Sequence, residues 1–590
     1  MVTYVLLMAV NCYFFPLAAL SGLLLLAPTP VLAQAPTLTA LTPASNARAV
    51  PRNASVVATF SQPLTAASAT ALKVFSSQRG GLRGGGTATV AGNRLSFAPT
   101  AYDFRPGETV QYTLTTGAAS SGGNLAAAQV GRFTAAAGAG TGLFAGGSDL
   151  VLSTTSFNTT HGVALGDVDG DGDLDIAAAN DNRSNTANST VSIALNGGRG
   201  TFGPGQNVPV NGRPFAVVLG DVDGDGDLDL LTANNRDPGT VSVRLNNGTG
   251  TFSGTQDVAV DRFAHSLALG DVDGDGDLDL VTANNFGMPL SGPAATASVR
   301  LNNGAGVFGG TQNVVVGMGA RSVMLGDLDN DGDLDFATAN SYANTVSICL
   351  NNGSGTFAST QSVAVGREPY GLALGDVDGD GDLDLATANY ANIGLGTASV
   401  RLNSGAATFG GAQEVTLNGS GPVMVVLGDV DGDADLDLLT ADGNTFNTVS
   451  VRLNGGTGTF GGSQSVPLAA GALPYDLALG DVDGDGDLDF VAANYYILGV
   501  SVRLNGGSGP LATAPGSAPA ALTAAPNPAT GRVALTLPPA ATTAELLDAL
   551  GRPVRRVPAT AGTATLDVTG LPVGLYLVRA AGQVARLLVE

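Results

Sequence analysis

Seven acidic loops recur along the chain, and they restrict its fold more than any other feature. Residues 220–230 read GDVDGDGDLDL, with aspartates at alternate positions, and close copies of this string begin 49 to 56 residues apart. Seven motifs of five Asp each hold 35 of the 50 acidic residues, so the net charge of −24 belongs mainly to one repeated structure. The sequence therefore predicts an array of similar units rather than one large core.

Each unit contains four short segments of alternating polarity. In the fifth unit, YGLALGDV runs into the acidic loop, and LDLATAN, TASVRLN and TFGGAQEVTL follow. Four strands at this period indicate the blades of a β-propeller. A spare fourth-strand segment, GLFAGGSDLVLS, precedes the first unit, and the last unit ends at VSVRLNGGSG without a fourth strand. We expect the spare strand to complete the last blade, which gives a seven-bladed propeller over 142–509.

The acidic loop, DVDGDGDLD, has the composition of a calcium site. The side chains at positions 1, 3, 5 and 9 and the backbone carbonyl at position 7 are hard oxygen ligands, which suit Ca²⁺ better than Mg²⁺. An EF-hand is excluded because position 12 is never Glu and no flanking helices are predicted. A tandem β-roll is excluded because three strands separate the loops. The alternative, a metal-free turn, would leave several like charges close together.

The sequence thus predicts up to seven Ca²⁺ ions, in loops that we number 1 to 7 in chain order. The Asp residues at positions 1, 3, 5, 7 and 9 are Asp167, Asp169, Asp171, Asp173 and Asp175 in loop 1; Asp221, Asp223, Asp225, Asp227 and Asp229 in loop 2; Asp271, Asp273, Asp275, Asp277 and Asp279 in loop 3; Asp327, Asp329, Asp331, Asp333 and Asp335 in loop 4; Asp376, Asp378, Asp380, Asp382 and Asp384 in loop 5; Asp429, Asp431, Asp433, Asp435 and Asp437 in loop 6; and Asp481, Asp483, Asp485, Asp487 and Asp489 in loop 7.

Two loops depart from the common pattern. Asn330 replaces Gly at position 4 of loop 4, a change that we expect to be harmless. Ala434 replaces Gly at position 6 of loop 6, where the sharp turn calls for a positive φ. Alanine in that conformation costs about 1 kcal/mol or more. Loop 6 is therefore predicted to be the weakest site.

The repeat also carries a family resemblance. The string ALGDVDGDGDLDLVTAN, with GTFGG upstream, resembles the FG-GAP or VCBS repeats of integrin-like propellers, whose loops bind Ca²⁺. Residues 36–136 lack the motif and alternate in polarity, as in ASVVATF and TVQYTLTT, which predicts a small β-sandwich. This segment resembles bacterial Ig-like domains, and the residues that carry the resemblance are Pro51, Phe60, Pro63, Gly107, Tyr112 and Gly123. The resemblance implies a spacer or accessory module.

The C-terminal segment has strands of its own. Residues 510–525 read as a flexible or extended linker. In 526–590, the strings APNPATGRVALTLP, LLDALGRPV and LDVTGLPVGLYLVRA resemble the type A sorting domain of the type IX secretion system, although Glu590 stands where that family often ends in a basic pair. The resemblance implies a second small β-sandwich, and it implies that the secretion machinery carries the protein across the outer membrane.

The N-terminal segment is apolar. Residues 1–33 are predicted to be a signal peptide, cleaved near Ala33 or Ala35, with Met8 as an alternative start. No Lys or Arg precedes Arg48, so an N-terminal membrane anchor is the alternative; no later stretch is apolar enough to span a bilayer. Cys12 lies in this segment, and Cys349 is predicted to be a buried apolar residue, so the chain has no disulfide framework.

Other polar and aromatic residues recur in register with the loops. His161 and His265 stand six residues before the first Asp of their loops, and they either pack at a strand entry or belong to a ring that holds a glycan or peptide. An Asn after each second strand predicts turn hydrogen bonds, and Asn-Gly pairs such as Asn196 and Asn247 predict tight hairpins. The positions equivalent to the two histidines hold Phe215, Arg321, Tyr370, Val423 and Tyr475.

The function predicted from these features is binding. The 26 basic residues are outnumbered by acidic ones, which excludes a nucleic-acid partner, and no nucleophile elbow, phosphate loop or zinc motif occurs. We expect an all-β protein, a seven-bladed propeller flanked by two small β-sandwiches, secreted to the outer cell surface. It would bind or adhere to an extracellular glycan or protein ligand. A propeller-based polysaccharide lyase or hydrolase is the alternative, followed by a structural surface component.

Overall fold

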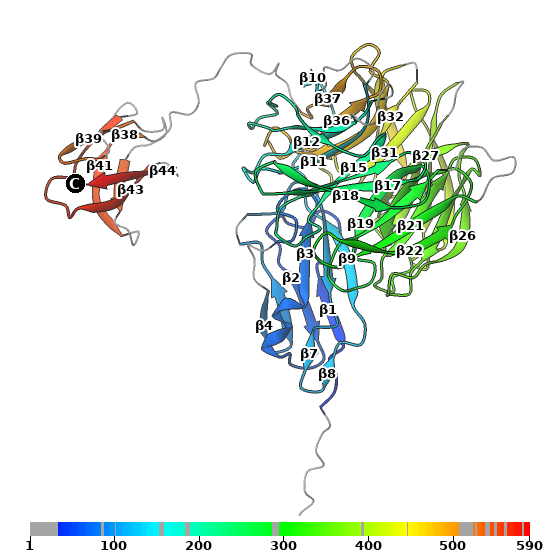
Figure 1. Cartoon of the computed structure of the whole chain (residues 1–590), viewed down its shortest axis with the longest axis horizontal. Coiled ribbons are helices and arrows are strands. Elements are labelled where there is room, and N and C mark those ends of the chain that lie inside the picture. The colour runs from blue at the N-terminus through cyan, green and yellow to red at the C-terminus, as the bar shows by residue number, and fades with distance from the viewer. Residues whose placement is uncertain are drawn as a thin grey trace, which may run out of the picture.

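The protein consists almost entirely of strands. The computed structural model describes residues 33–506 and 523–589, apart from short gaps at 84–87, 101, 153–157, 183–188, 286–293, 391–393, 445, 526–527, 537–542, 548–551, 560–562 and 581–582. Within them one 3₁₀ helix, η1 (Ala66–Thr70), stands among the strands, so the predicted all-β class is confirmed (Figure 1). In the described part, no helix is long and apolar enough to cross a membrane. The predicted signal peptide, except Ala33, and most of the predicted linker lie outside the described residues.

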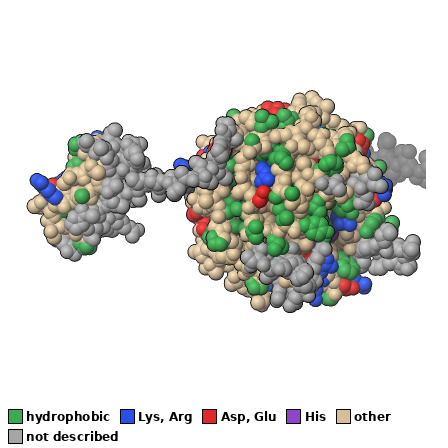
Figure 2. All heavy atoms as spheres, turned by 90° about the horizontal axis from the view of Figure 1, so that it is seen from above, with side chains coloured by type: hydrophobic (Ala, Val, Ile, Leu, Met, Phe, Trp, Pro, Cys, Tyr) green, Lys and Arg blue, Asp and Glu red, His purple; other side chains and the backbone are tan. Residues whose placement is uncertain are grey.

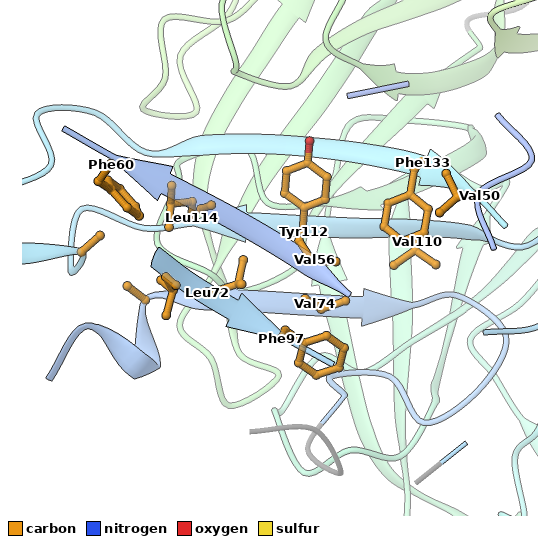
Figure 3. Close-up of a cluster of buried hydrophobic side chains, with 14 of the residues drawn as sticks. Val50, Val56, Phe60, Leu72, Val74, Phe97, Val110, Tyr112, Leu114 and Phe133 are labelled. Atoms are coloured by element: carbon orange, nitrogen blue, oxygen red, sulfur yellow. The ribbon is translucent and has the colours of Figure 1, made fainter. Parts of the chain in front are cut away.

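The N-terminal domain is a sandwich of two antiparallel sheets. Alternate residues of its strands point inward, and Phe60, Tyr112 and Phe133 fill the space between the sheets (Figure 3). One sheet contains, in order, β1 (Leu38–Thr42), β2 (Val56–Phe60), β5 (Arg94–Phe97) and β4 (Thr89–Ala91); the other contains β3 (Leu72–Ser76), β6 (Thr109–Leu114) and β9 (Gln129–Thr134); and β7 (Ala119–Ser120) pairs with β8 (Gly123–Asn124).

Seven four-stranded antiparallel sheets follow in the described residues 148–503, and in each an acidic loop joins the first strand to the second. We number these blades 1 to 7 by the loop that each contains. Blade 1 contains β11 (Asn158–Gly166), β12 (Asp175–Asn182), β13 (Thr190–Ala194) and β14 (Gln206–Pro209); blade 2 contains β15 (Pro214–Gly220), β16 (Asp229–Asn234), β17 (Thr240–Asn246) and β18 (Phe252–Ala259); blade 3 contains β19 (Ala264–Gly270), β20 (Asp279–Asn284), β21 (Thr296–Asn302) and β22 (Phe308–Val315). Blade 4 contains β23 (Ala320–Gly326), β24 (Asp335–Asn340), β25 (Thr345–Leu350) and β26 (Ala358–Ala364); blade 5 contains β27 (Pro369–Gly375), β28 (Asp384–Asn389), β29 (Thr397–Asn403) and β30 (Phe409–Thr416). Blade 6 contains β31 (Pro422–Gly428), β32 (Asp437–Asp442), β33 (Thr448–Asn454) and β34 (Phe460–Pro467); blade 7 contains β35 (Pro474–Gly480), β36 (Asp489–Asn494), β37 (Gly499–Arg503) and β10 (Ser148–Leu150).

The blades form a ring. The first strand of each blade contacts that of the next, and β35 contacts β11. Blade 7 takes its fourth strand from the N-terminal side, where β10 pairs with β37 and Ser148 lies opposite Val502. This is the pairing that the spare strand predicts. The segment just before β10 makes the same contact as the segments before the fourth strands of other blades. The backbone N–H of Gly142 donates to the carbonyl of Val430, just as that of Gly250, before β18, donates to the carbonyl of Val168.

The blades share their cores with their neighbours. Every residue of each second strand from β16 onward, and all eight residues of β12, are buried, because adjacent blades cover both faces of the sheet. Ile193 of blade 1, for example, belongs to the same cluster as Leu219 and Leu230 of blade 2. Cys349 is fully buried in such a cluster, as predicted.

The C-terminal domain has its own core of aliphatic side chains around Leu546 and Val578. Its first strand begins in the segment that the sequence assigns to the linker. The strands are β38 (Thr523–Ala525), β39 (Arg532–Thr536) and β42 (Thr563–Asp567) in one sheet, and β41 (Pro553–Pro558), β40 (Thr543–Leu547), β43 (Gly574–Ala580) and β44 (Gln583–Val589) in the other.

Candidate functional site

The acidic loops join the first and second strands of each blade. In loop 2, the position 1 residue Asp221 is buried and accepts the backbone N–H of Gly224 at 2.7 Å and that of Gly226 at 2.9 Å. The N–H groups of Asp225 and Asp227 donate to the carboxylates two residues earlier, at 3.3 and 2.9 Å. The chain is thus folded around its own carboxylates, which turns the first three toward one centre.

The position 9 aspartate holds the loop to the rest of the blade. In loop 2, Oδ2 of Asp229 accepts the N–H of Val222 at 2.9 Å, and Oδ1 accepts the N–H of Asn246 at 2.8 Å. Burial raises the pKa of Asp229 to about 7, an increase that these two hydrogen bonds oppose. The same pair of bonds recurs in all seven loops, so this residue has a structural role beside the predicted ligand role.

The carboxylates converge as a metal site requires. In loops 1, 4 and 5 the groups contain positions 1, 3 and 9, and in loops 2 and 3 they contain positions 1, 3 and 5; within each group one oxygen per residue lies within 4.8 Å of the others. Two oxygens that bind one Ca²⁺ at about 2.3–2.6 Å are at most about 4.6–5.2 Å apart, so this spacing is compatible with a shared ion. None of these five groups includes the side chain at position 7, whose predicted ligand is the backbone carbonyl.

Some of these oxygens have no partner in the protein. Oδ1 of Asp327 and Oδ1 of Asp329 are buried without a hydrogen-bond partner, and burial raises the pKa of Asp327 to about 6. A buried carboxylate oxygen without a donor is unfavourable unless a cation offsets it. The residues present therefore fit a hard divalent cation.

The backbone at position 6 has the positive φ that the sequence predicts. The six glycines have φ between 91° and 101°, and Ala434 has a φ of 75°. Asn330, at position 4 of loop 4, has a φ of 62°, in the left-handed region that asparagine tolerates better than most residues. The strain expected at loop 6 is therefore present at Ala434.

The third strands end in asparagines that join neighbouring blades, which differs from the predicted hairpins. β17 ends at Asn246 and β18 begins at Phe252, so five residues connect them instead of a two-residue turn. Nδ2 of Asn246 donates to the carbonyl of Leu228 in its own loop at 3.1 Å and to that of Val168 in the preceding loop at 2.8 Å. The bond to the preceding loop is made by Asn196, Asn246, Asn302, Asn351, Asn403, Asn454 and Asn505.

A second set of polar residues lies inside the blades. The Asn at the end of each second strand was predicted to bond within a turn, but in the structure it bonds mainly to the neighbouring strand. Asn234, for example, is buried and donates to Oγ of Ser242 at 2.9 Å and to Oγ1 of Thr240 at 3.0 Å. In blade 6 the residue is Asp442, which accepts from Ser450 and Thr448 at 2.7 and 2.9 Å. Burial raises the pKa of Asp442 to about 6.

The N-terminal domain docks on the face of the propeller that carries the acidic loops (Figure 1). Nε of Arg79 lies 3.2 Å from Oδ2 of Asp167, and the N–H of Leu82 donates to Asp221 at 2.9 Å. Arg48 lies between loops 5 and 6, with Nη1 3.3 Å from Oδ1 of Asp435. No sequence pattern signals this interface, because its residues come from separate turns of the sandwich.

First-strand residues line a central channel, with a cavity of about 320 Å³, and the same domain covers one end of it. Nε2 of Gln78 donates to the carbonyl of Leu479, and that of Gln111 to the carbonyl of Leu269, at 3.1 and 3.4 Å. Both Nη atoms of Arg132 donate at 3.2 Å to carbonyls at the ends of first strands, and burial lowers the pKa of Arg132 to about 10. Four blades are thus held from the centre by one domain.

Family models match these three parts of the chain. A model described as FG-GAP-like repeat matches residues 167–232, 221–282, 327–387 and 429–492, and one described as FG-GAP repeat matches 263–305. The chain contains FG-GAP repeats. A bacterial Ig-like domain matches 33–135, and a secretion system C-terminal sorting domain matches 523–587. The predicted family resemblances are confirmed, and the sorting domain indicates export through the type IX pathway to the cell surface or beyond it.

Known proteins add little to this assignment. No curated protein sequence matches the chain. Similar solved structures include the rhamnogalacturonan lyase YesW, at 13% identity and a TM-score of 0.37, covering 78% of this chain and 90% of that one. They also include the periplasmic gluconolactonase PpgL of Pseudomonas aeruginosa, at 16% identity and a TM-score of 0.39, covering 62% and 95%. Likenesses this distant give no information about activity.

The other end of the FG-GAP propeller channel is an axial mouth lined by the seven positions that stand six residues before each loop. His161 stacks on Phe215 with ring centroids 4.0 Å apart, and its ring meets that of Tyr475 edge-on at 5.0 Å. The guanidinium of Arg321 lies 3.8 Å above the ring of Tyr370. Together they line a cavity of about 70 Å³: His161, Phe215, His265, Arg321, Tyr370, Val423 and Tyr475.

The mouth of the FG-GAP propeller is surrounded by loops that expose apolar side chains. These loops follow the second strands and include Tyr342, Leu395, Phe446 and Tyr496, which are 37% to 63% exposed. Figure 2, which views the molecule from the side opposite the Ig-like domain, shows hydrophobic side chains scattered over this face and few acidic ones. The aspartates are concentrated on the opposite face, where the Ig-like domain docks.

Proposed function

We propose that this protein with FG-GAP repeats is an exported, calcium-stabilised binding or adhesion protein whose ligand, an extracellular glycan or protein, contacts the axial mouth. The observation that carries the proposal is the convergence of seven variable side chains, one from each blade, at the open end of the channel. The Ig-like domain covers the other end, so a ligand approaching along the axis meets the mouth first.

Calcium has a structural task in this proposal. The carboxylates at positions 1, 3, 5 and 9, with the carbonyl at position 7, would hold the ion, and its charge would offset the repulsion between them. Position 9 orients the loop through its two backbone hydrogen bonds. Extracellular modules bind Ca²⁺ at about 10⁻⁴–10⁻³ M, so the loops would fill outside the cell.

The mouth offers chemistry suited to sugars or to a polar peptide. Tyr370 stacks on Tyr390 at 4.6 Å and Tyr475 on Tyr495 at 5.4 Å, which holds these rings in fixed orientations. Nη1 of Arg321 lies 3.2 Å from Nε2 of His265, and burial lowers the pKa of His265 to about 3, so this histidine is neutral. Arg321 therefore supplies the positive charge of this pair, and rigid aromatic rings lie beside it.

The test is a binding screen on glycan and matrix-protein arrays, run with and without Ca²⁺ and paired with a polysaccharide-degradation assay. For any ligand found, the triple variant Tyr370→Ala, Tyr475→Ala, His265→Ala should lose binding. Val315→Ala, on the exposed face of the outer strand β22, is the matched control and should bind normally. Binding that survives the triple variant would place the ligand elsewhere.

An enzyme is the second candidate, and one residue favours it. Asp476 lines the mouth, and burial raises its pKa to about 7, a value suited to general acid–base work. However, Oδ2 and Oδ1 of Asp476 accept the N–H groups of Val163 and Leu477 at 3.0 and 2.9 Å, which is a structural role. Turnover of a polysaccharide that Asp476→Asn abolishes would favour a lyase or hydrolase; binding without turnover supports the first proposal.

A further inference from the structure

Loop 1 holds its first aspartate differently from the other loops. In loops 2, 3, 5, 6 and 7 the N–H groups of positions 4 and 6 both donate to position 1, and in loop 4 that of position 6 does. In loop 1 Asp167 is only 5% exposed, and its carboxylate interacts with the backbone N–H of Gly170 at position 4 but accepts no hydrogen bond from Gly172 at position 6. Its nearest charged neighbour is Arg79 of the Ig-like domain, at 3.2 Å.

Arg79 is held against loop 1 by several contacts. The N–H of Asp167 donates to the carbonyl of Gln78 at 2.8 Å, which brings the two backbones together. The guanidinium stacks on Tyr102 at 3.8 Å, and a Cβ built on Gly172 would lie 2.9 Å from its Nη2. The guanidinium therefore lies against position 6 of the loop as well as beside position 1.

A second guanidinium, that of Arg105, is within electrostatic range of the same loop. Nε and Nη2 of Arg105 are buried without hydrogen-bond partners. Burial lowers the pKa of Arg105, with Arg79 acting in the same direction, and the charges of Asp167, Asp481 and Asp173 oppose this. Two positive charges thus act on loop 1 from the Ig-like domain.

Loop 5 shows that an arginine nearby does not by itself alter a loop. Nε of Arg48 lies 3.7 Å from Oδ2 of Asp376. Asp376 still accepts the N–H groups of Gly379 and Gly381 at 2.7 and 3.1 Å, as in the loops without an arginine. Arg48 therefore adds to the ordinary arrangement of loop 5, whereas at loop 1 Arg79 lies against position 6, whose N–H does not donate to position 1.

We propose that Arg79 is a tethered cation that substitutes for Ca²⁺ in loop 1, so that the docked protein binds six ions and uses loop 1 to fasten the Ig-like domain. This inference rests on the proposed binding of Ca²⁺ by the other loops. The carboxylates of loop 1 converge like those elsewhere and need a positive charge. The guanidinium of Arg79 supplies it, and a divalent ion bound beside that guanidinium would be repelled.

The experiment counts bound ions on the exported full-length chain by equilibrium dialysis with ⁴⁵Ca²⁺ up to about 10 mM, tenfold above the weakest affinity expected for such modules. Three variants remove the exposed position 5 carboxylate: Asp171→Ala in loop 1, Asp225→Ala in loop 2 and Asp380→Ala in loop 5, whose converging carboxylates occupy the same positions as those of loop 1. Asp225→Ala and Asp380→Ala should each lose one ion relative to the parent, and Asp171→Ala should lose none. Arg79→Gln should gain one ion, and Arg48→Gln, the control arginine, should gain none.

The comparison of the position 5 variants is robust to partial filling of loop 6 and to misfolding of Arg79→Gln. Partial occupancy of loop 6 by Ca²⁺ would lower the ion count of each variant equally. Positions 171 and 225 are exposed, so the variants at these positions should fold, and comparing their ion counts still tests the role of Arg79 if Arg79→Gln fails to fold. Loss of one ion in Asp171→Ala as well as in Asp225→Ala would overturn the role of Arg79 while leaving the calcium proposal intact. A parent chain that binds no Ca²⁺ would overturn both.

Discussion

Nδ2 of Asn246 in blade 2 lies 2.8 Å from the carbonyl oxygen of Val168 in the acidic loop of blade 1. The backbone N–H of the same asparagine donates to Asp229, the last residue of its own loop. Because the pattern is repeated by the equivalent asparagine of every blade, each acidic loop is hydrogen-bonded to the next around the ring. Neighbouring loops are thus linked through a single side chain.

This relationship predicts unequal effects at two adjacent asparagines. Asn246→Ala leaves two buried carbonyl groups without one of their donors and should lower the free energy of unfolding by about 1–3 kcal/mol. Asn247→Ala removes an exposed turn residue whose Oδ1 accepts from Thr249, and should change stability by about 0.5 kcal/mol or less. Urea denaturation of both variants measures the difference; equal effects would contradict the bridging role.

Removal of Ca²⁺ should destabilise the propeller. An ion present at 100 times its Kd stabilises the folded state by about 2.7 kcal/mol per site. The carboxylates would also repel each other once the ion is gone. We expect EDTA to lower the melting temperature of the full-length chain, measured by calorimetry, and excess CaCl₂ to restore it. Mg²⁺ at the same concentration is the control, and a melting temperature indifferent to EDTA would refute calcium stabilisation.

Loop 6 should bind more tightly once its strain is removed. Ala434 has a φ of 75°, which costs about 1 kcal/mol relative to glycine. If Ala434 leaves this conformation when the metal dissociates, only the metal-bound state carries the strain. Ala434→Gly, which removes the strain, should then strengthen Ca²⁺ binding at this loop about fivefold. Terbium luminescence titration would follow the weakest site. Gly381→Ala, at position 6 of loop 5, is the reverse substitution and should weaken its site by a similar factor. No change in either variant would argue against the loop geometry.

Asp442 should make blade 6 sensitive to pH. Its pKa rises from 3.8 to about 6 on folding, so between these values the native state binds more protons than the unfolded state. Stability therefore falls as pH rises through this window and is lowest above pH 6. Asp442→Asn, which copies the other six blades, should recover up to about 3 kcal/mol at pH 8 and much less at pH 5. Melting curves at the two pH values test this; an equal gain at both would exclude ionisation as the cause.

The repeated features of this protein could be read from its sequence for a physical reason. A blade is built from local alternation and a nine-residue loop, so strand order, the spare strand β10 and the positive φ at position 434 follow from residues close together in the chain. The carboxylates of a loop converge for the same reason. The two-residue turns predicted at the Asn-Gly pairs were wrong, because the asparagine that ends each third strand is bonded to another blade and a longer connection follows it, which no local pattern reveals.

The sequence by itself thus determined the all-β architecture, the places of the acidic loops and the three parts of the chain, because each depends on short-range periodicity and on backbone conformation. Only the tertiary structure decided how the loops are linked, where the Ig-like domain docks and which residues meet at the mouth. Arg79 and Asp167, or His161 and Tyr475, are far apart in the chain and meet only when the ring closes and the domains pack.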